Sequence, residues 1–372
     1  MRFWHSLRHL ALQSLRPVYY KLHDEERLGP ELDPGSCQQQ KTPETPRKAA
    51  IYCIILLVNL AIFGLLLRKL EPLIALLRFN KLLFSPHVFL PNPETTQYNN
   101  ETFQHHQIPL ILHQTAATKK IPDRWVQSQK SCKKAYSEFE YKLWTDDSAR
   151  HFLSEHYSWF VPTWDNYAFP IQRADAIRYF VLYHYGGIYL DMDTTCNNTL
   201  PAQIMGSDQV KDYALFKPTR PTGVTNDLLV ASPRHPIYKL AISRLPAYNS
   251  ITRSWARLQP YSAIMISAGP MFLTMVVKEY LLEQHTLPSN TTGIVEEATL
   301  VPYITDLQSG TWHRADARIL MWMGERPWVW FVLGTLVLVV SLYIIDQLIL
   351  LVYARFRGFP SEFSVIKSHK KA

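Results

Sequence analysis

Asp191 and Asp193 are the first candidates for chemistry in this sequence. They stand two residues apart in the apolar run 188–193, which alternates as a β-strand does. Residues two apart on a strand share a face, so we expect both carboxylates, with Tyr189, to lie opposite the core-facing side. Such a pair at the carboxyl end of a strand suits a hard divalent cation, Mn²⁺ or Mg²⁺, with positions open for phosphate oxygens. A solvated strand end without a ligand is the alternative.

Asp175 and Arg178 form a second charged pair just before the acidic strand. They lie three residues apart in the predicted helix 171–185, and Gly186 and Gly187 lead that helix directly into the strand. The spacing places both side chains on one face of the helix. The functional interpretation is a cation and a carboxylate beside the metal pair. The alternative is a surface ion pair worth a few tenths of a kcal/mol.

The elements that must position these residues alternate between strands and helices. Apolar runs predict strands at 108–113, 141–144, 188–193 and near Val301. Helical periodicity and capping residues predict helices at 123–136, 146–157, 171–185, 236–245 and 271–285. This alternation favours one α/β domain with a mainly parallel sheet, extending over residues 108–325.

Two long apolar runs flank this domain. Residues 49–67 and 328–353 are each long enough to cross the hydrocarbon core of a bilayer, so we predict two transmembrane helices. Asp346 is costly at mid-bilayer, and we therefore expect it near one interface or paired. Residues 68–107 form a juxtamembrane amphipathic segment and a stalk. Within it, residues 70–84 either lie in the membrane interface or continue the first helix, bent at Pro72.

The distribution of charge indicates the topology. The tail 1–48 carries eight Lys and Arg and the tail 354–372 carries five, which predicts that both termini are cytosolic and the middle luminal. Candidate N-glycosylation sites support this orientation, because Asn100, Asn197 and Asn290 all lie between the two apolar runs.

The net charge of +8 therefore does not describe the folded domain. Residues 86–325 hold 21 bases and 22 acids, or −1, which leaves 39 − 21 = 18 bases and 31 − 22 = 9 acids, or +9, for the tails and membrane flanks. The domain lacks a basic helix or an aromatic RNA-binding motif. We therefore exclude nucleic acid as a partner.

Four cysteines divide by compartment. Cys37 falls in a cytosolic tail and Cys53 in a membrane helix, whereas Cys132 and Cys196 share the lumen. An oxidising lumen permits one disulfide between the last two, and two buried thiols remain the alternative. The spacing does not fit a zinc site.

Several stretches together resemble glycosyltransferase family 32. They are ADAIRY (174–179), YGGIYLDMD (185–193), IPLILHQT (108–115), YKLWTDD (141–147) and SGTWHRADA (309–317). The resemblance covers residues 108 to about 318, nearly the whole domain. It implies a GT-A-like, nucleotide-sugar-binding fold and a retaining enzyme.

The resemblance also implies roles for single residues. Asp191 and Asp193 hold Mn²⁺ and through it the donor diphosphate, with His313 as a third metal ligand. The remaining donor-binding residues are Asp175, Arg178, His113, Gln114, Thr115 and Trp312. Adjacent carboxylates of this kind do not suit a glycoside hydrolase, which needs two carboxylates on opposite sides of the sugar.

One further stretch narrows the branch of the family. GVTNDLLVASPRHPIY (223–238) and the second apolar run resemble the catalytic subunit of fungal inositol phosphorylceramide mannosyltransferases. This implies transfer from GDP-mannose to inositol phosphorylceramide in the membrane of the Golgi, or else of the endoplasmic reticulum, beside a multispanning regulatory subunit. Asp227 is the candidate for acceptor contact and catalysis. The alternatives are an α-1,6-mannosyltransferase acting on protein N-glycans and a non-catalytic, membrane-tethered glycan-binding subunit.

Overall fold

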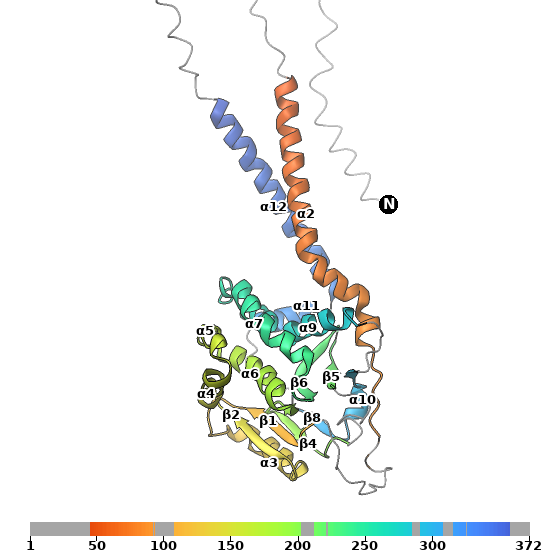
Figure 1. The fold of residues 1–372 in the computed structure, drawn as a ribbon. Coiled ribbons are helices and arrows are strands. Elements are labelled where there is room, and N and C mark those ends of the chain that lie inside the picture. Colours follow the sequence, from red (N-terminus) through yellow and green to blue (C-terminus); the bar gives the residue numbers. More distant parts are fainter. Residues whose placement is uncertain are drawn as a thin grey trace, which may run out of the picture. The chain divides into compact units, whose positions relative to one another are not determined.

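The structure is a computed structural model that describes residues 45–91, 93, 108–201, 212–220, 222–284, 291–307, 315–324 and 326–357. The chain divides into two compact units, Met1–Ile54 and Ile55–Ala372. In the first unit the described residues are the beginning of helix α2 (Thr45–Phe84). The second unit holds the remaining described elements, and the fold below is that of this unit (Figure 1).

Three stretches are long and apolar enough to cross a membrane among the described residues. They are Ala49–Phe84, Pro260–Leu282 and Trp328–Arg355. The first and last belong to α2 and α12 (Pro327–Arg357), and their most apolar windows are 6% and 0% buried. The middle stretch is 56% buried and consists of two helices, α8 (Pro260–Ser267) and α9 (Pro270–Leu282). Side chains of this stretch therefore form part of the domain core.

The two outer helices meet at one polar pair. Asn59 of α2 donates a hydrogen bond from Nδ2 to Oδ1 of Asp346 in α12, at 3.2 Å. The expectation that Asp346 is paired is confirmed, and its partner is an uncharged amide. The pair also fixes which faces of the two helices lie together.

The end of α2 packs on the domain. Pro72 lies inside the continuous helix, which bends as it approaches the domain (Figure 1). Leu76, Leu83 and Phe84 are buried in the domain core, and Lys278 of α9 donates from Nζ to the carbonyl oxygen of Pro72 at 2.9 Å. Of the two alternatives for residues 70–84, the structure therefore contains the bent continuation of the first helix.

A six-stranded sheet forms the centre of the domain, with the order β2-β1-β3-β6-β5-β7. The strands are β1 (Ile111–Thr115), β2 (Glu140–Trp144), β3 (Gly187–Leu190), β5 (Ala214–Pro218), β6 (Val224–Ala231) and β7 (Thr292–Ile294). Three of its five neighbouring pairs are parallel, and the two pairs that include β6 are antiparallel. A second, two-stranded sheet joins β4 (Thr194–Cys196) to β8 (Ile304–Asp306). The prediction of a mainly parallel sheet thus holds outside β6.

Helices cover both faces of the sheet. The other helices are α3 (Asp123–Ala135), α4 (Asp146–His156), the 3₁₀ helix η1 (Ser158–Phe160), α5 (Val161–Asp165), α6 (Pro170–Tyr185), α7 (Pro236–Arg253), α10 (Glu297–Leu300) and α11 (Ala315–Gly324). Tyr189 and Leu229 face a core that includes α6, α7 and α9, whereas Ile188 and Leu228 face a core that includes Cys132 of α3. This layering is the α/β architecture expected from the sequence.

Several boundaries differ from prediction. The first strand begins at Ile111 rather than 108, and helix 236–245 continues through Pro246 to Arg253. Residues near Val301 follow α10, and the strand there is β8. The acidic strand ends at Leu190, because Thr194 donates from its amide to the carbonyl of Asp191 and turns the chain. Asp193 therefore lies in a turn and not on a strand.

Candidate active site

The turn between α6 and β3 brings the charged helix residues back to the acidic strand. Gly186 and Gly187 have φ of 68° and 102°, and a Cβ on Gly187 would stand 2.6 Å from the carbonyl oxygen of Ile111. Glycine is therefore required by both backbone angle and space. The tight turn returns the chain into β3, inside the sheet, and brings Asp191 after that strand within reach of Arg178.

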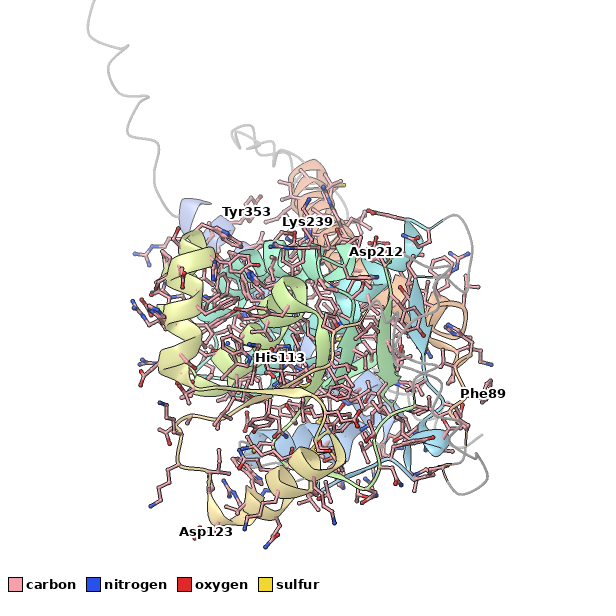
Figure 2. All side chains as sticks on the ribbon, turned by 60° about the horizontal axis from the view of Figure 1, so that its bottom comes forward. Phe89, His113, Asp123, Asp212, Lys239 and Tyr353 are labelled. Atoms are coloured by element: carbon pink, nitrogen blue, oxygen red, sulfur yellow. A yellow bond between two sulfur atoms is a disulfide. The ribbon has the colours of Figure 1, made fainter. Side chains whose placement is uncertain are left out.

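His113 supports this turn from inside the domain. Its Nε2 donates to the carbonyl oxygen of Gly186 at 2.9 Å, and its Nδ1 accepts from Nε1 of Trp144 at 3.0 Å. The ring is fully buried, and Figure 2 shows it in the interior while Phe89 lies at the periphery. Burial lowers the pKa of His113 to about 4. Both ring nitrogens are engaged by the protein, so we assign His113 a positioning role in place of the predicted donor contact.

Arg178 joins the helix to the strand. Its Nη2 lies 2.8 Å from Oδ1 of Asp175 and its Nη1 lies 3.1 Å from Oδ1 of Asp191. Asn226 of β6 donates to Asp175 at 3.0 Å and accepts from Arg178 through its backbone carbonyl. We call Asp175, Arg178, Asp191 and Asn226 the Arg178 cluster. Only Asp191 has a partly exposed side chain, at 30%.

Asp191 is held by a second set of contacts from β1 and β3. Tyr189 donates from its hydroxyl to Oδ1 of Asp191 at 2.9 Å, and Thr115 donates to the same tyrosine oxygen at 2.8 Å. Gln114 donates from Nε2 to the backbone carbonyl of Asp191 at 3.3 Å. Burial raises the pKa of Asp191 to about 7; Arg178 opposes that rise and nearby carboxylates add to it. The structure thus brings Gln114 and Thr115 to Asp191, although their contacts here are with protein.

Asp227 is the neighbour of Asp191 across the β3–β6 pair. The backbone amide of Asp191 donates to the carbonyl of Asp227 at 2.9 Å, continuing the antiparallel register. Lys217 of β5 lies 2.7 Å from Oδ2 of Asp227 and 3.9 Å from Oδ2 of Asp306. Oδ1 of Asp227 is buried and has no hydrogen-bond partner among the described residues. It is an unmatched acceptor beside Asp191.

Lys217 and Asn226 are the functional candidates that sequence reasoning missed. Lys217 was the detectable one, because it is a single charge inside the apolar run ALFKP (214–218). Asn226 directly precedes Asp227, but its contact with Asp175 spans 51 residues of sequence. No local sequence pattern marks either the Lys217–Asp227 contact or the Asn226–Asp175 contact.

The carboxylate oxygens of Asp191 and Asp193 fit a hard divalent cation. The contacts of Asp191 with Arg178 and Tyr189 are made by Oδ1, so a cation would bind at Oδ2, and the buried Oδ1 of Asp227 adds an unmatched acceptor nearby. The described residues contain no ready-made group of three or more His, Cys, Asp and Glu for a metal ion. The predicted third ligand, His313, and the predicted donor-binding residue Trp312 lie outside the described residues.

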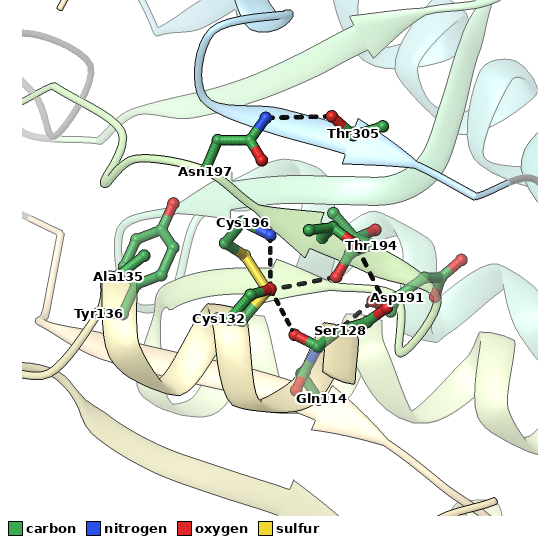
Figure 3. The surroundings of a disulfide bond; sticks show 12 residues. Gln114, Ser128, Cys132, Ala135, Tyr136, Asp191, Thr194, Cys196, Asn197 and Thr305 are labelled. Atoms are coloured by element: carbon green, nitrogen blue, oxygen red, sulfur yellow. Dashed lines mark hydrogen bonds between the residues drawn. A yellow bond between two sulfur atoms is a disulfide. The ribbon is translucent and has the colours of Figure 1, made fainter. Parts of the chain in front are cut away.

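A disulfide fixes the segment after Asp193. Cys132 of α3 and Cys196 of β4 are bonded, with their Cα atoms 4.7 Å apart, which decides the question the sequence left open (Figure 3). Ser131 of α3 also accepts from the amide of Cys196 at 3.0 Å. The acidic turn is thereby held between β3 and a strand tied to α3.

The glycosylation candidates have different positions. Asn197, one residue after the disulfide, is exposed, and its side chain donates to the hydroxyl of Thr305 at 3.0 Å (Figure 3). Asn100 and Asn290 lie outside the described residues.

Comparison with known proteins identifies the family. Residues 122–212 match a glycosyltransferase sugar-binding region containing a DXD motif. Inositol phosphoceramide mannosyltransferase 3 of Schizosaccharomyces pombe is 33% identical over 279 residues, covering 72% of this chain and 75% of that protein. The chain therefore belongs to the same glycosyltransferase family as this mannosyltransferase. Mannosyl phosphorylinositol ceramide synthase SUR1 of Saccharomyces cerevisiae is 37% identical over 219 residues, or 57% of this chain.

The extent of these matches differs among relatives. The match to SUR1 covers 54% of its length, so the chain spans about half of that protein. Among solved structures, PaToxG glycosyltransferase aligns with 47% of this chain at 15% identity and a TM-score of 0.35. The family membership rests on the sequence relatives.

Proposed function

We propose that the protein is a retaining mannosyltransferase that moves mannose from GDP-mannose to inositol phosphoceramide, forming mannosylinositol phosphoceramide. The observation that carries the proposal is the Arg178 cluster, which holds Asp191 of the DXD motif at the carboxyl end of β3. The named acceptor of the relatives supports the lipid substrate. The fold class we infer is GT-A-like.

The cluster gives Asp191 a fixed geometry before any ligand binds. Arg178 and Tyr189 both contact its Oδ1, so the other oxygen keeps a constant direction. A Mn²⁺ or Mg²⁺ ion held by Asp191 and Asp193 would stabilise the negative charge that develops on the leaving diphosphate. The side chain of Asp175 is buried, so it does not contact a ligand directly and acts by holding Arg178. The donor-binding roles of Asp175, Arg178, Gln114 and Thr115 are thus largely the positioning of Asp191.

Asp227 is the residue we assign to the acceptor. Lys217 engages its Oδ2 and leaves Oδ1 buried and unmatched beside Asp191, where an acceptor hydroxyl can donate to it. We propose front-face attack, in which the departing phosphate oxygen takes the acceptor proton while Asp227 orients the hydroxyl. Asp227→Ala should lower kcat. Full turnover with only a raised acceptor KM would exclude a catalytic role.

The membrane arrangement is part of the proposal. We infer two transmembrane helices, α2 and α12, because their apolar surfaces are bare while α8 and α9 are largely buried. With basic tails at both ends, the domain faces the lumen of the Golgi or the endoplasmic reticulum. The disulfide supports this side of the membrane, because such bonds persist in oxidising compartments. A multispanning regulatory subunit is the expected partner.

One transfer experiment tests the substrate and the site together. Membranes containing the full chain are given labelled GDP-mannose and Mn²⁺, with inositol phosphoceramide and a mannose-rich N-glycan offered in parallel. We expect label in the lipid, its loss in Asp193→Ala, and its retention in the surface control Asp165→Ala, whose carboxylate is 46% exposed. Label only in the glycan would replace the lipid acceptor with the α-1,6-mannosyltransferase alternative. Full transfer by Asp193→Ala would overturn the site.

A further inference from the structure

Helix α11 presents an apolar face that the domain does not cover. Ala317 is fully buried, and Asp316 accepts at Oδ2 from the backbone amide of Tyr261 at 2.8 Å, so one side of α11 is fixed against the start of α8. Ile319, Met321 and Trp322 are each half exposed or more. Scattered exposed apolar residues are ordinary, but three on a ten-residue helix form a patch.

The patch extends to the segment before α8. Leu258 is 86% exposed and lies three residues before Tyr261, the residue bonded to Asp316. An extended three-residue segment spans only about 10 Å, so Leu258 lies beside the beginning of α11. We call Arg257, Leu258, Arg318, Ile319, Met321 and Trp322 the α11 surface.

Continuity with α12 sets where this surface lies. α11 ends at Gly324 and α12 begins at Pro327, a separation of at most about 11 Å along the chain. The apolar stretch of α12 begins at Trp328, which is 67% exposed. If α12 spans the bilayer as proposed above, α11 must stand at the luminal membrane boundary. A helix of ten residues is only about 15 Å long, so all of α11 stays near that boundary.

The charges of the α11 surface distinguish between possible occupants. Arg257 and Arg318 are exposed, and neither forms an ion pair within the described part of the chain. Arg326 lies over the ring of Trp322, 4.7 Å from its centroid. Basic side chains interleaved with tryptophan and aliphatic residues are typical of surfaces that enter the headgroup layer of a membrane. A water-facing helix would not need the apolar residues, and the unpaired arginines beside them match the phosphates of a lipid surface.

We propose that the α11 surface is a second membrane contact, in which Leu258, Ile319 and Trp322 enter the luminal leaflet and Arg257 and Arg318 bind the phosphates of anionic lipid headgroups. This contact rests on the proposed span of α12 and is separate from the sugar-transfer chemistry. It holds the domain down on the bilayer at a point distinct from α2.

Depth measurement of spin labels tests the contact. The full chain, with Cys37→Ser and Cys53→Ser, carries a nitroxide at Ile319→Cys and is reconstituted into nanodiscs of either neutral or anionic phospholipid. Val301→Cys is the matched control, because Val301 is 65% exposed on another part of the domain. In anionic nanodiscs we expect the label at 319 to be accessible to oxygen and shielded from a water-soluble nickel chelate, while the label at 301 stays aqueous.

The lipid charge supplies the decisive comparison. Two arginines near an anionic surface should shift the ratio of embedded to aqueous label at 319 by about an order of magnitude between the two lipid compositions. Arg257→Glu with Arg318→Glu should abolish that difference. An aqueous label at 319 in both lipids would overturn the proposal, as would equal embedding in both. Shielding from both oxygen and nickel would also overturn it, because it indicates a protein contact. None of these results depends on transferase activity, so the contact can fail while the proposed function stands.

Discussion

Asp191 at the end of β3 and Asp346 in α12 are both carboxylates that other side chains contact, but the number and kind of their partners differ. Asp191 receives a guanidinium group and a phenol at one oxygen, and its arginine is held by a further carboxylate. Asp346 receives one amide, at 3.2 Å, and Oδ1 of the Asn59 amide is itself buried without a partner among the described residues.

This difference in partners distinguishes the candidate binding site at Asp191 from the contact between two helices at Asp346. A charged group in low dielectric needs several partners, and Asp191 has several where Asp346 has one. A single interhelical hydrogen bond between membrane helices contributes much less, commonly under 2 kcal/mol. We therefore expect a change in the Arg178 cluster to cost more stability and function than a change in the Asn59–Asp346 pair, which sets how α2 and α12 lie together.

The largest effect should come from removing the centre of the cluster. Arg178→Gln leaves Asp175 and Asp191 without their cation, and breaking a buried pair in this way costs about 3–5 kcal/mol. Arg150→Gln is the matched control, because Arg150 pairs with Asp165 at the surface and such pairs are worth about 1 kcal/mol or less. Denaturant unfolding of the full chain in detergent measures both. Equal losses in the two variants would remove the distinction between the cluster and an ordinary ion pair.

A buried group with only neutral partners gives the second effect. His113 has a pKa of about 4 in the fold, below its ordinary value of 6.5, because burial penalises the charged ring. The unfolded chain therefore takes up the proton first, and stability is lost as pH falls from about 6.5 towards 4. The loss from this residue approaches about 3 kcal/mol.

Unfolding free energies measured across that pH range check the assignment. His113→Phe should be less stable at neutral pH, since Gly186 loses its donor, but its stability should fall less steeply with acid. An unchanged slope would show that His113 is not the buried neutral base.

The smallest effect is expected in the Asn59–Asp346 pair. Asp346→Leu removes one interhelical hydrogen bond and one costly carboxylate, so we expect a net change of about 1 kcal/mol or less and retained transferase activity. Gln347→Leu is the control, because Gln347 is the adjacent polar residue and is exposed. Loss of activity in Asp346→Leu but not in Gln347→Leu would contradict the distinction between the Arg178 cluster and the Asn59–Asp346 pair. It would assign this pair a role in function.

The sequence predicted best the elements whose signals are local. The bounds of α3, α4 and α6 fall within about two residues of expectation, since amphipathic periodicity and the Gly186–Gly187 stop are written in adjacent residues. The DXD motif and the Asp175–Arg178 spacing likewise identified the charged site. β5 and β6 were missed because both faces of these strands are covered, so no alternation marks them.

Contacts between segments that are distant in the sequence determined the features that local sequence patterns could not predict. Tyr189 was expected opposite the core but is fully buried, because α6 covers that face of β3. Lys217 joins the site only through the pairing of β5 with β6, and Asn226 only through the contact of β6 with α6. Such contacts depend on how distant segments meet, which spacing within one segment does not encode.

Binding of Mn²⁺ to the full chain in the presence of GDP-mannose tests the central claim most directly, because it reports the acidic site without requiring turnover. Electron paramagnetic resonance of free Mn²⁺ gives the affinity. Asp191→Asn and Asp193→Asn should each weaken it by more than the 10- to 100-fold typical of outer-shell changes, while Asp165→Asn leaves it unchanged. Wild-type affinity in both DXD variants would contradict the account.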